Sequence, residues 1–287
     1  MTISVSNEVE DEQALAASPL RLQLVPHRHT KIVHLIRHGQ GFHNVAGHAD
    51  YSQYKSFDYI DSHLTDFGWH QAWALNWHIK QLGSRFRVDA VVVSPLTRTL
   101  ETAAGVFGSG PWREGSNSQP PLMLEQTVVP GKRAAHHAIA AEGCPPFIAW
   151  EGCREQLGKH PCDKRRPMRE ISPSFPAVDF SLLESDEDNL WLSADWRESH
   201  DEIRKRGVEF VRWLQQRPEQ HIAVVSHSAF LFFMMSNFGR GAATSVQSEL
   251  HKWYDNCEMR TVVLCDEDGA HNHADPLWFQ GGQHSVK

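Results

Sequence analysis

Short, continuous apolar runs that alternate with helical patterns constrain the fold of this chain more than any other feature. Residues 31–36 (KIVHLI), 89–94 (DAVVVS) and 221–226 (HIAVVS) are rich in β-branched residues and are predicted to be buried strands. Strands without polar alternation are typical of parallel sheets that are covered on both faces. The sequence therefore predicts an α/β fold: a three-layer, doubly wound, mainly parallel sheet with helices on both faces.

Helical periodicity fills the segments between these strands. Thr65 is predicted to cap a helix that runs to about residue 82, because apolar residues recur along one stripe of that segment. Further helices are predicted at 97–107, 197–216 and 229–238, and further strands at 122–129 and 259–266.

The remaining segments are predicted from composition. Residues 1–30 are acidic at first and low in aromatics, so we expect a flexible leader before a single domain over 31–287. Gly, Pro and Ser are frequent from residue 108, and periodicity is weak up to about residue 200. This region, about 108–200, is predicted to be an insertion of loops and short helices.

Charge and hydropathy exclude several function classes. The formal net charge of −7 over 287 residues argues against binding to nucleic acid or to an anionic membrane. No apolar run approaches the roughly 20 residues of a membrane-spanning helix. The N-terminus has no basic-then-apolar signal pattern, so a cytoplasmic location is expected.

Cysteine and histidine patterns predict neither disulfides nor a metal site. The five cysteines form no CxxC pair, which favours reduced, structural thiols. His27-x-His29, His136-His137 and His271-x-His273 have no second cluster at zinc-finger spacing. We therefore expect no metal and no other cofactor.

Polar residues follow three predicted strands at the point where each strand ends. The first is followed by Arg37, His38 and Gly39, the second reaches Arg98 within four residues, and the third is followed by His227. Ligands of parallel α/β sheets bind beyond the carboxyl ends of the strands. We therefore expect two guanidinium groups and two imidazoles to meet at one edge.

A phosphate dianion is the ligand that this charge set favours. Arginine binds phosphate oxygens with paired N–H groups. Gly39 is expected to let the backbone approach closely, and Asn44 to supply an amide donor. A helix start after the first strand would add N–H groups and the positive end of a helix dipole.

The same residues suggest a reaction at phosphorus. A neutral imidazole with an ordinary pKa of about 6.5 can attack phosphorus in line, and His38 is the best candidate. His227 is expected to hold the transferred oxygens as a cation. The leaving alkoxide needs a carboxylic acid, for which Glu151 and Glu155 are candidates.

Four segments of the chain resemble a known family. RHGQGFHN (37–44), LTDFGWHQA (64–72), SPLTRTLETA (94–103) and SHSAFL (226–231) are similar to motifs of the histidine phosphatase superfamily, also called phosphoglycerate mutase-like. The resemblance runs from about residue 31 to 265, and the variant around 150–166 looks most like the eukaryotic phosphoglycerate mutase-like subgroup. Where the family more often has glycine after the late histidine, this chain has Ser228.

The resemblance implies a set of site residues under the inserted region. Arg37, His38, Arg98 and His227 would form the phosphate pocket, with His38 as nucleophile. The substrate-binding set would also include three further positions: Gly39, Asn44 and Ser228. The proton donor is assigned to Glu155, with Glu151 in reserve.

Three functions are open at this point. The first is a metal-independent phosphomonoesterase that acts on a small phosphorylated metabolite through a phosphohistidine. The second is a phosphoglycerate mutase that uses the same intermediate, although the substrate-gripping motif of mutases is not found. The third is a phosphate-binding module without turnover.

Other residues receive structural interpretations. The run from Asp163 to Arg166 is interpreted as a solvated charge run, with the alternative that Arg165 or Arg166 grips a second anion. His34 is expected to be a core or sheet-face histidine. The tryptophans predicted to serve in packing are Trp69, Trp73, Trp77 and Trp213.

Overall fold

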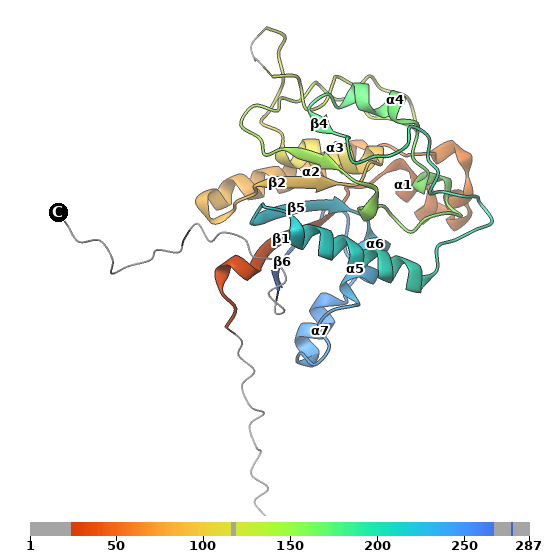
Figure 1. Ribbon diagram of the computed structural model, residues 1–287. Coiled ribbons are helices and arrows are strands. Elements are labelled where there is room, and N and C mark those ends of the chain that lie inside the picture. The colour runs from red at the N-terminus through yellow and green to blue at the C-terminus, as the bar shows by residue number, and fades with distance from the viewer. Residues whose placement is uncertain (1–23, 116–118, 267–276, 278–287) are drawn as a thin grey trace, which may run out of the picture.

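One mainly parallel sheet organises the protein. The computed structural model describes residues 24–115, 119–266 and Leu277. Within these residues six strands pair in the order β4-β3-β2-β5-β1-β6, and only β6 runs antiparallel to its neighbour. In Figure 1 the labelled strands β4, β2, β5, β1 and β6 follow one another from top to bottom. The strands are β1 (Thr30–Arg37), β2 (Ala90–Val93), β3 (Phe147–Ala149), β4 (Val178–Asp179), β5 (His221–Ser226) and β6 (Met259–Cys265).

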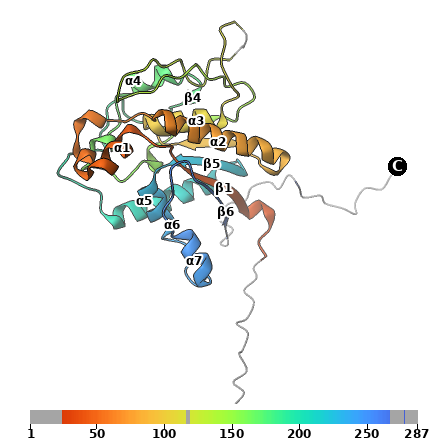
Figure 2. The ribbon, with the colours of Figure 1, turned by 180° about the vertical axis from the view of Figure 1, so that it is seen from behind.

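Helices cover both faces of this sheet, as Figures 1 and 2 show from opposite sides. Side chains alternate along a strand, so Val91 and Val93 pack in the cluster with α2 and α3, whereas Val92 packs with α5 and α6. The predicted three-layer α/β fold is confirmed. The helices are α1 (Phe42–Ala49), α2 (Asp66–Leu82), α3 (Thr97–Phe107), α4 (Met168–Ile171), α5 (His200–Gln216), α6 (Ser228–Met235) and α7 (Thr244–Leu250).

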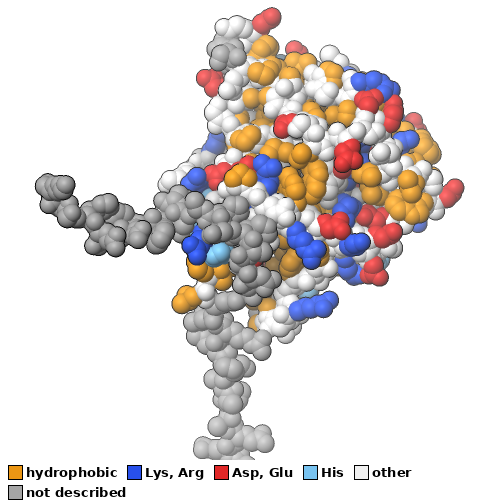
Figure 3. All heavy atoms as spheres, viewed as in Figure 1, with side chains coloured by type: hydrophobic (Ala, Val, Ile, Leu, Met, Phe, Trp, Pro, Cys, Tyr) orange, Lys and Arg blue, Asp and Glu red, His pale blue; other side chains and the backbone are white. Residues whose placement is uncertain are grey.

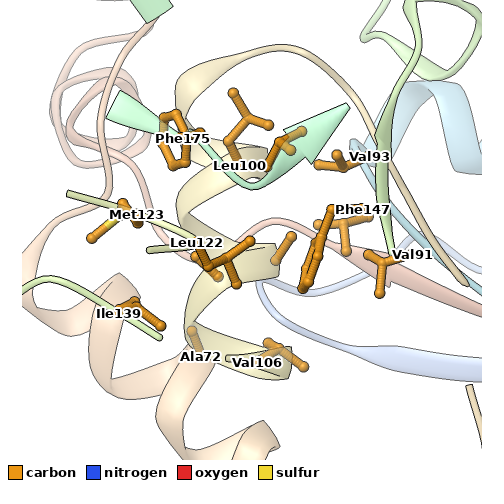
Figure 4. Close-up of a cluster of buried hydrophobic side chains, with 14 of the residues drawn as sticks. Ala72, Val91, Val93, Leu100, Val106, Leu122, Met123, Ile139, Phe147 and Phe175 are labelled. Carbon is orange, nitrogen blue, oxygen red and sulfur yellow. The ribbon is translucent and has the colours of Figure 1, made fainter. Parts of the chain in front are cut away.

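The predicted helix starts are confirmed where a cap signals them. The Thr65 hydroxyl accepts the Gly68 N–H at 3.0 Å, so α2 begins where the sequence predicts. The next helix, α3, is buried along nearly its whole length. It lies between the sheet and the inserted region, and Figure 4 shows Leu100 and Val106 among side chains of both.

The strand prediction for 122–129 is wrong. This segment makes only isolated antiparallel bridges, such as Met123 with Ile139 and Gln126 with His136, and joins no sheet. Two strands of the sheet, β3 and β4, lie instead within the region predicted to hold loops and short helices. They span three and two residues, which is too short for a periodicity to be read from the sequence.

Single-residue interpretations have mixed outcomes. His34 is buried in β1, where its ring contacts the Thr261 hydroxyl at 2.9 Å and the Arg87 carbonyl at 3.3 Å, as expected of a core histidine. Trp69 is buried, but the packing role predicted for Trp77 is wrong because this side chain is 66% exposed.

Acidic and basic side chains are interspersed on the face in Figure 3. None of the helices in the described part of the chain has the length and apolar character needed to cross a membrane. Residues 27–29 of the predicted leader form a short 3-10 helix and Thr30 begins β1, whereas residues 1–23 lie outside the described residues.

Candidate active site

Three parallel strands end at one edge of the sheet and bring distant residues together. Arg37 of β1 lies in register with Ser226 of β5, and Val93 of β2 lies in register with Val225. The residues that follow β1 and β5 therefore meet. The ring centroids of His38 and His227 are 5.2 Å apart.

The Arg98 guanidinium lies between these two imidazoles. Its Nε is 3.3 Å from His38 Nε2, and its Nη2 is 3.2 Å from His227 Nδ1. Arg98 is the second residue of α3, so the helix start after β2 delivers it to the same edge. The three side chains are at most 2% exposed, and they are three of the four that the sequence predicts to meet at this edge.

Hydrogen-bond partners fix the tautomer of each ring. His38 Nδ1 lies 2.7 Å from the Gly39 carbonyl oxygen, which can only accept, so Nδ1 carries the proton and Nε2 keeps its lone pair. His227 Nε2 lies 2.8 Å from the Ser94 hydroxyl. Because arginine can only donate, His227 Nδ1 is the acceptor of that ring.

The surroundings of both rings favour the neutral form. Burial, followed by the Arg98 charge, lowers the pKa of His38 and of His227 well below the ordinary value. These surroundings do not favour the cationic form expected of His227 from the sequence. The neutral form of His38 agrees with the role of a nucleophile.

Two groups from the inserted region hold Arg98 in place. Nη1 donates to the Cys162 carbonyl at 2.6 Å, and Nη2 donates to Asp163 Oδ1 at 2.9 Å. The other oxygen of Asp163 lies 3.3 Å from Arg197 Nη1. Asp163 is only 4% exposed, so the prediction of a solvated charge run is wrong at this residue.

The neighbouring arginines of that run also donate hydrogen bonds to groups within the protein. Arg165 is 2% exposed, and each of its guanidinium nitrogens donates to Glu151 or to backbone carbonyls. Arg166 donates to Asp61 and to the Thr97 hydroxyl at the start of α3. The alternative that Arg165 grips a second anion is therefore contradicted, because its nitrogens are already engaged.

Arg37, at the end of β1, has a different environment. Its Nη1 donates to the Tyr254 carbonyl at 2.8 Å, while its Nε is buried without a hydrogen-bond partner among the described residues. Burial lowers the pKa of this guanidinium. A phosphoryl oxygen would supply the missing partner.

The loop after β1 uses its N–H groups within the protein. The Gly39 N–H donates to the Thr102 hydroxyl at 3.0 Å, and the Gly41 N–H donates to the Asn44 side chain at 2.9 Å. A Cβ at Gly39 would lie 2.7 Å from the Gly68 carbonyl oxygen, which is too close, so position 39 requires glycine. The first N–H groups of α1 also have protein partners.

The two candidate acids, Glu155 and Glu151, differ in their hydrogen-bond and ion-pair partners. Glu155 accepts the N–H groups of Ala229 and Phe230 at 3.3 and 3.0 Å, in the first turn of α6 after His227 and Ser228. Its charge acts on Arg37. Glu151 is instead paired with Arg154 and Arg165 at 3.0 and 2.8 Å.

Comparison with known proteins shows the family of this chain. The model of the "Histidine phosphatase superfamily (branch 1)" matches residues 33–111 and 130–273. The chain belongs to the histidine phosphatase superfamily.

The relatives of this superfamily member include plant proteins. It is 44% identical over 243 residues to a phosphoglycerate mutase-like protein of Arabidopsis thaliana, covering 85% of this chain and 88% of that protein. Phosphoglycerate mutase-like protein 1 of the same plant is 42% identical, with 85% and 84% covered. A solved mycobacterial glucosyl-3-phosphoglycerate phosphatase has 14% identity and a TM-score of 0.43, with 82% and 90% covered.

Sequence reasoning missed some members of the site. Asp163 and Ser94 contact the predicted residues directly, but Asp163 was included in a charge run. The sequence feature that could have indicated Asp163 is its position directly before three basic residues, in a region without periodicity. In the described ranges no group of three His, Cys, Asp or Glu side chains is placed to hold a metal ion; His271 and His273 lie outside them.

Proposed function

We propose that this protein is a phosphomonoesterase that hydrolyses a small phosphorylated metabolite through a phosphohistidine on His38, without a metal ion. The observation that carries the proposal is the His38 ring, whose tautomer leaves the lone pair of Nε2 at 3.3 Å from Arg98. A neutral nucleophile beside a fixed cation suits attack on a phosphoryl group whose charge must be stabilised.

The first half of the reaction forms the phosphoenzyme. Phosphoryl oxygens would take the unpartnered Nε–H of Arg37. They would also replace His38 and His227 as acceptors of the Arg98 N–H groups, which frees the Nε2 lone pair of His38. His38 Nε2 then attacks phosphorus, the bond from phosphorus to the ester oxygen breaks, and Glu155 gives its proton to the leaving alkoxide. Fixed arginines stabilise the charge on the equatorial oxygens.

His227 can join the phosphate ligands through a proton shift. The Ser94 hydroxyl both donates and accepts, so it supports either tautomer of His227. Once a phosphoryl oxygen replaces the Arg98 N–H beside Nδ1, that nitrogen becomes a donor.

The second half returns the enzyme to its starting form. A water molecule attacks the phosphohistidine, and the Glu155 carboxylate takes one proton from it. The bond from phosphorus to Nε2 breaks, which releases inorganic phosphate and restores neutral His38. Glu155 is then protonated for the next cycle.

One experiment tests this proposal. Purified protein is incubated with a panel of phosphorylated metabolites and an aryl phosphate in excess chelator, and inorganic phosphate is measured. We expect release that disappears in His38→Ala. Activity that vanishes on chelation and returns with zinc or magnesium would contradict the metal-independent mechanism.

A mutase remains the second candidate, favoured by the burial of His38 and His227 at 2% and 0% exposure. A phosphoenzyme must exclude water if it is to return its phosphoryl group to the substrate. Interconversion of 2- and 3-phosphoglycerate faster than release of inorganic phosphate would decide for this activity.

A further inference from the structure

Five rings form a continuous series that leads away from His38; we call it the ring series. His38 lies 5.6 Å from His43, measured between ring centroids, and His43 lies 6.1 Å from Tyr54. Tyr54 in turn lies 5.6 Å from His160 and 5.3 Å from Tyr51. These spacings are those of stacked or edge-to-face aromatic pairs.

Exposure increases along the ring series. His38 and His43 are 2% and 4% exposed, Tyr54 and His160 are half-buried, and Tyr51 is 68% exposed. The series therefore connects the buried nucleophile to solvent. The outermost ring, Tyr51, is therefore accessible to a ligand from solvent.

The ring series is built from three chain segments. His38 and His43 follow β1, the tyrosines come from the 3-10 helix Tyr51–Lys55, and His160 precedes the 3-10 helix Pro161–Asp163. The last of these helices carries Asp163, which holds Arg98. The outer rings are thus fixed relative to the phosphate-binding arginine.

The proposed proton donor is near enough for its charge to affect one of the outer rings. The Glu155 charge acts on His160 as well as on Arg37. Because the acid must reach the leaving oxygen, the alcohol half of the substrate would start at Glu155, whose charge reaches His160.

The outer rings are uncharged at neutral pH. Burial, aided by Arg197 and Lys159, lowers the pKa of His160 to about 4, and burial raises the pKa of Tyr54. Neutral rings provide flat faces for stacking rather than a charge for ion pairing.

We propose that the ring series binds the alcohol half of the substrate, and that this half is a planar, unsaturated ring. The inference rests on the phosphatase activity proposed above and names its substrate class: phosphate monoesters of ring-bearing alcohols. A stacked ring should favour such an ester over a saturated one by about fivefold.

The test compares benzyl phosphate with cyclohexylmethyl phosphate in excess chelator. Both esters release a primary alcohol of similar acidity, and they differ in whether the ring is flat and aromatic. We measure kcat/KM for each ester, and their ratio does not depend on the fraction of folded enzyme. Wild type is expected to prefer benzyl phosphate by about fivefold.

Three variants test whether the Tyr51 ring causes the preference for benzyl phosphate. Tyr51→Leu should reduce the ratio toward one, whereas Tyr51→Phe should keep it because the ring is retained. Trp77→Leu removes an equally exposed aromatic side chain on α2, outside the ring series, and should keep the wild-type ratio.

The outcomes separate this inference from the function on which it rests. Equal kcat/KM for the two esters, a preference for the saturated ester, or a ratio unchanged by Tyr51→Leu would overturn the stacking assignment. The same holds if neither ester is cleaved while a generic aryl phosphate is. No phosphate release from any ester would overturn the phosphatase proposal itself, and the ring assignment with it.

Discussion

The Nε–H of Arg98 donates to Nε2 of His38 across 3.3 Å, so the proposed nucleophile and the phosphate-binding cation share one hydrogen bond. This contact occupies the His38 lone pair, so a phosphoryl oxygen must take over the Arg98 N–H before Nε2 can attack phosphorus. It also contributes to the low pKa of His38, because a nearby positive charge disfavours the imidazolium. The predictions below depend on this pair and on the groups that hold it.

We expect the phosphatase activity to require an arginine at position 98. Arg98→Ala is expected to lower kcat by about 100- to 1,000-fold, the range found when a fixed donor to transition-state charge is removed. Arg98→Lys should recover little, because lysine lacks the planar fork. Steady-state kinetics with an aryl phosphate in chelator measure both variants. Arg204→Ala, which changes a partly exposed arginine on α5, serves as control; near-normal kinetics in Arg98→Ala would contradict the assignment.

Asp163 should stabilise the fold through Arg98. Asp163→Ala leaves a buried guanidinium without its carboxylate and should cost about 3–5 kcal/mol in the free energy of unfolding. Added inorganic phosphate should restore more stability to this variant than to wild type, because the anion replaces the carboxylate beside Arg98. Urea unfolding with and without phosphate measures both effects.

The exposed pair of Arg169 and Asp186 provides the matched control. Asp186→Ala should cost at most about 1 kcal/mol, since the charges of an exposed pair are solvated. If phosphate stabilises wild type and Asp163→Ala equally, Asp163 does not hold a phosphate-binding group.

The buried histidines should make the protein acid-labile. The pKa values of His38 and His227 are lowered, and that of His160 is lowered to about 4. The folded state thus binds fewer protons than the unfolded state below about pH 6.5, so the free energy of unfolding falls as pH drops through this value. It has its full value above that pH.

The His160 contribution can be isolated by mutation. Between pH 6.5 and 4 it amounts to a loss of about 3 kcal/mol in wild type. His160→Gln cannot titrate, so its unfolding free energy should depend less steeply on pH over this interval, as measured by urea unfolding. Identical slopes for the two proteins would show that His160 titrates normally in the folded state.

We expect Glu155 to give its proton to the leaving group. Glu155→Gln is expected to lower kcat by about 100- to 10,000-fold for an alkyl phosphate. The loss should be smaller for para-nitrophenyl phosphate, whose leaving group departs without a proton. Glu151→Gln is the matched control, because Glu151 pairs with Arg154 and Arg165. If Glu151→Gln shows the leaving-group dependence and Glu155→Gln does not, the roles are reversed.

The meeting of His38, Arg98 and His227 could be predicted because it follows from local patterns. Apolar runs identify the strands, and parallel strands end at one edge, so the residues after each strand must meet. Thr65 signals the start of α2 in the same way, through a cap whose bond lies within one turn.

Other parts of the site depend on contacts that leave no local pattern. Asp163 reaches Arg98 across 65 residues of sequence from a region without periodicity. The strand β3 spans three residues, yet it starts the segment that carries Glu155 to the edge. The charge of His227 depends on burial, which the sequence around residue 227 does not encode.

The most direct test of the account is to find the phosphoryl group on the enzyme. Protein mixed with substrate is quenched in alkaline denaturant, digested with trypsin and analysed by mass spectrometry with fragmentation. We predict one added phosphoryl group on the peptide spanning residues 38–55, located on His38 rather than His43 or His48, and none in His38→Ala. A phosphoryl group on another residue, or wild-type turnover by His38→Ala, would contradict the account.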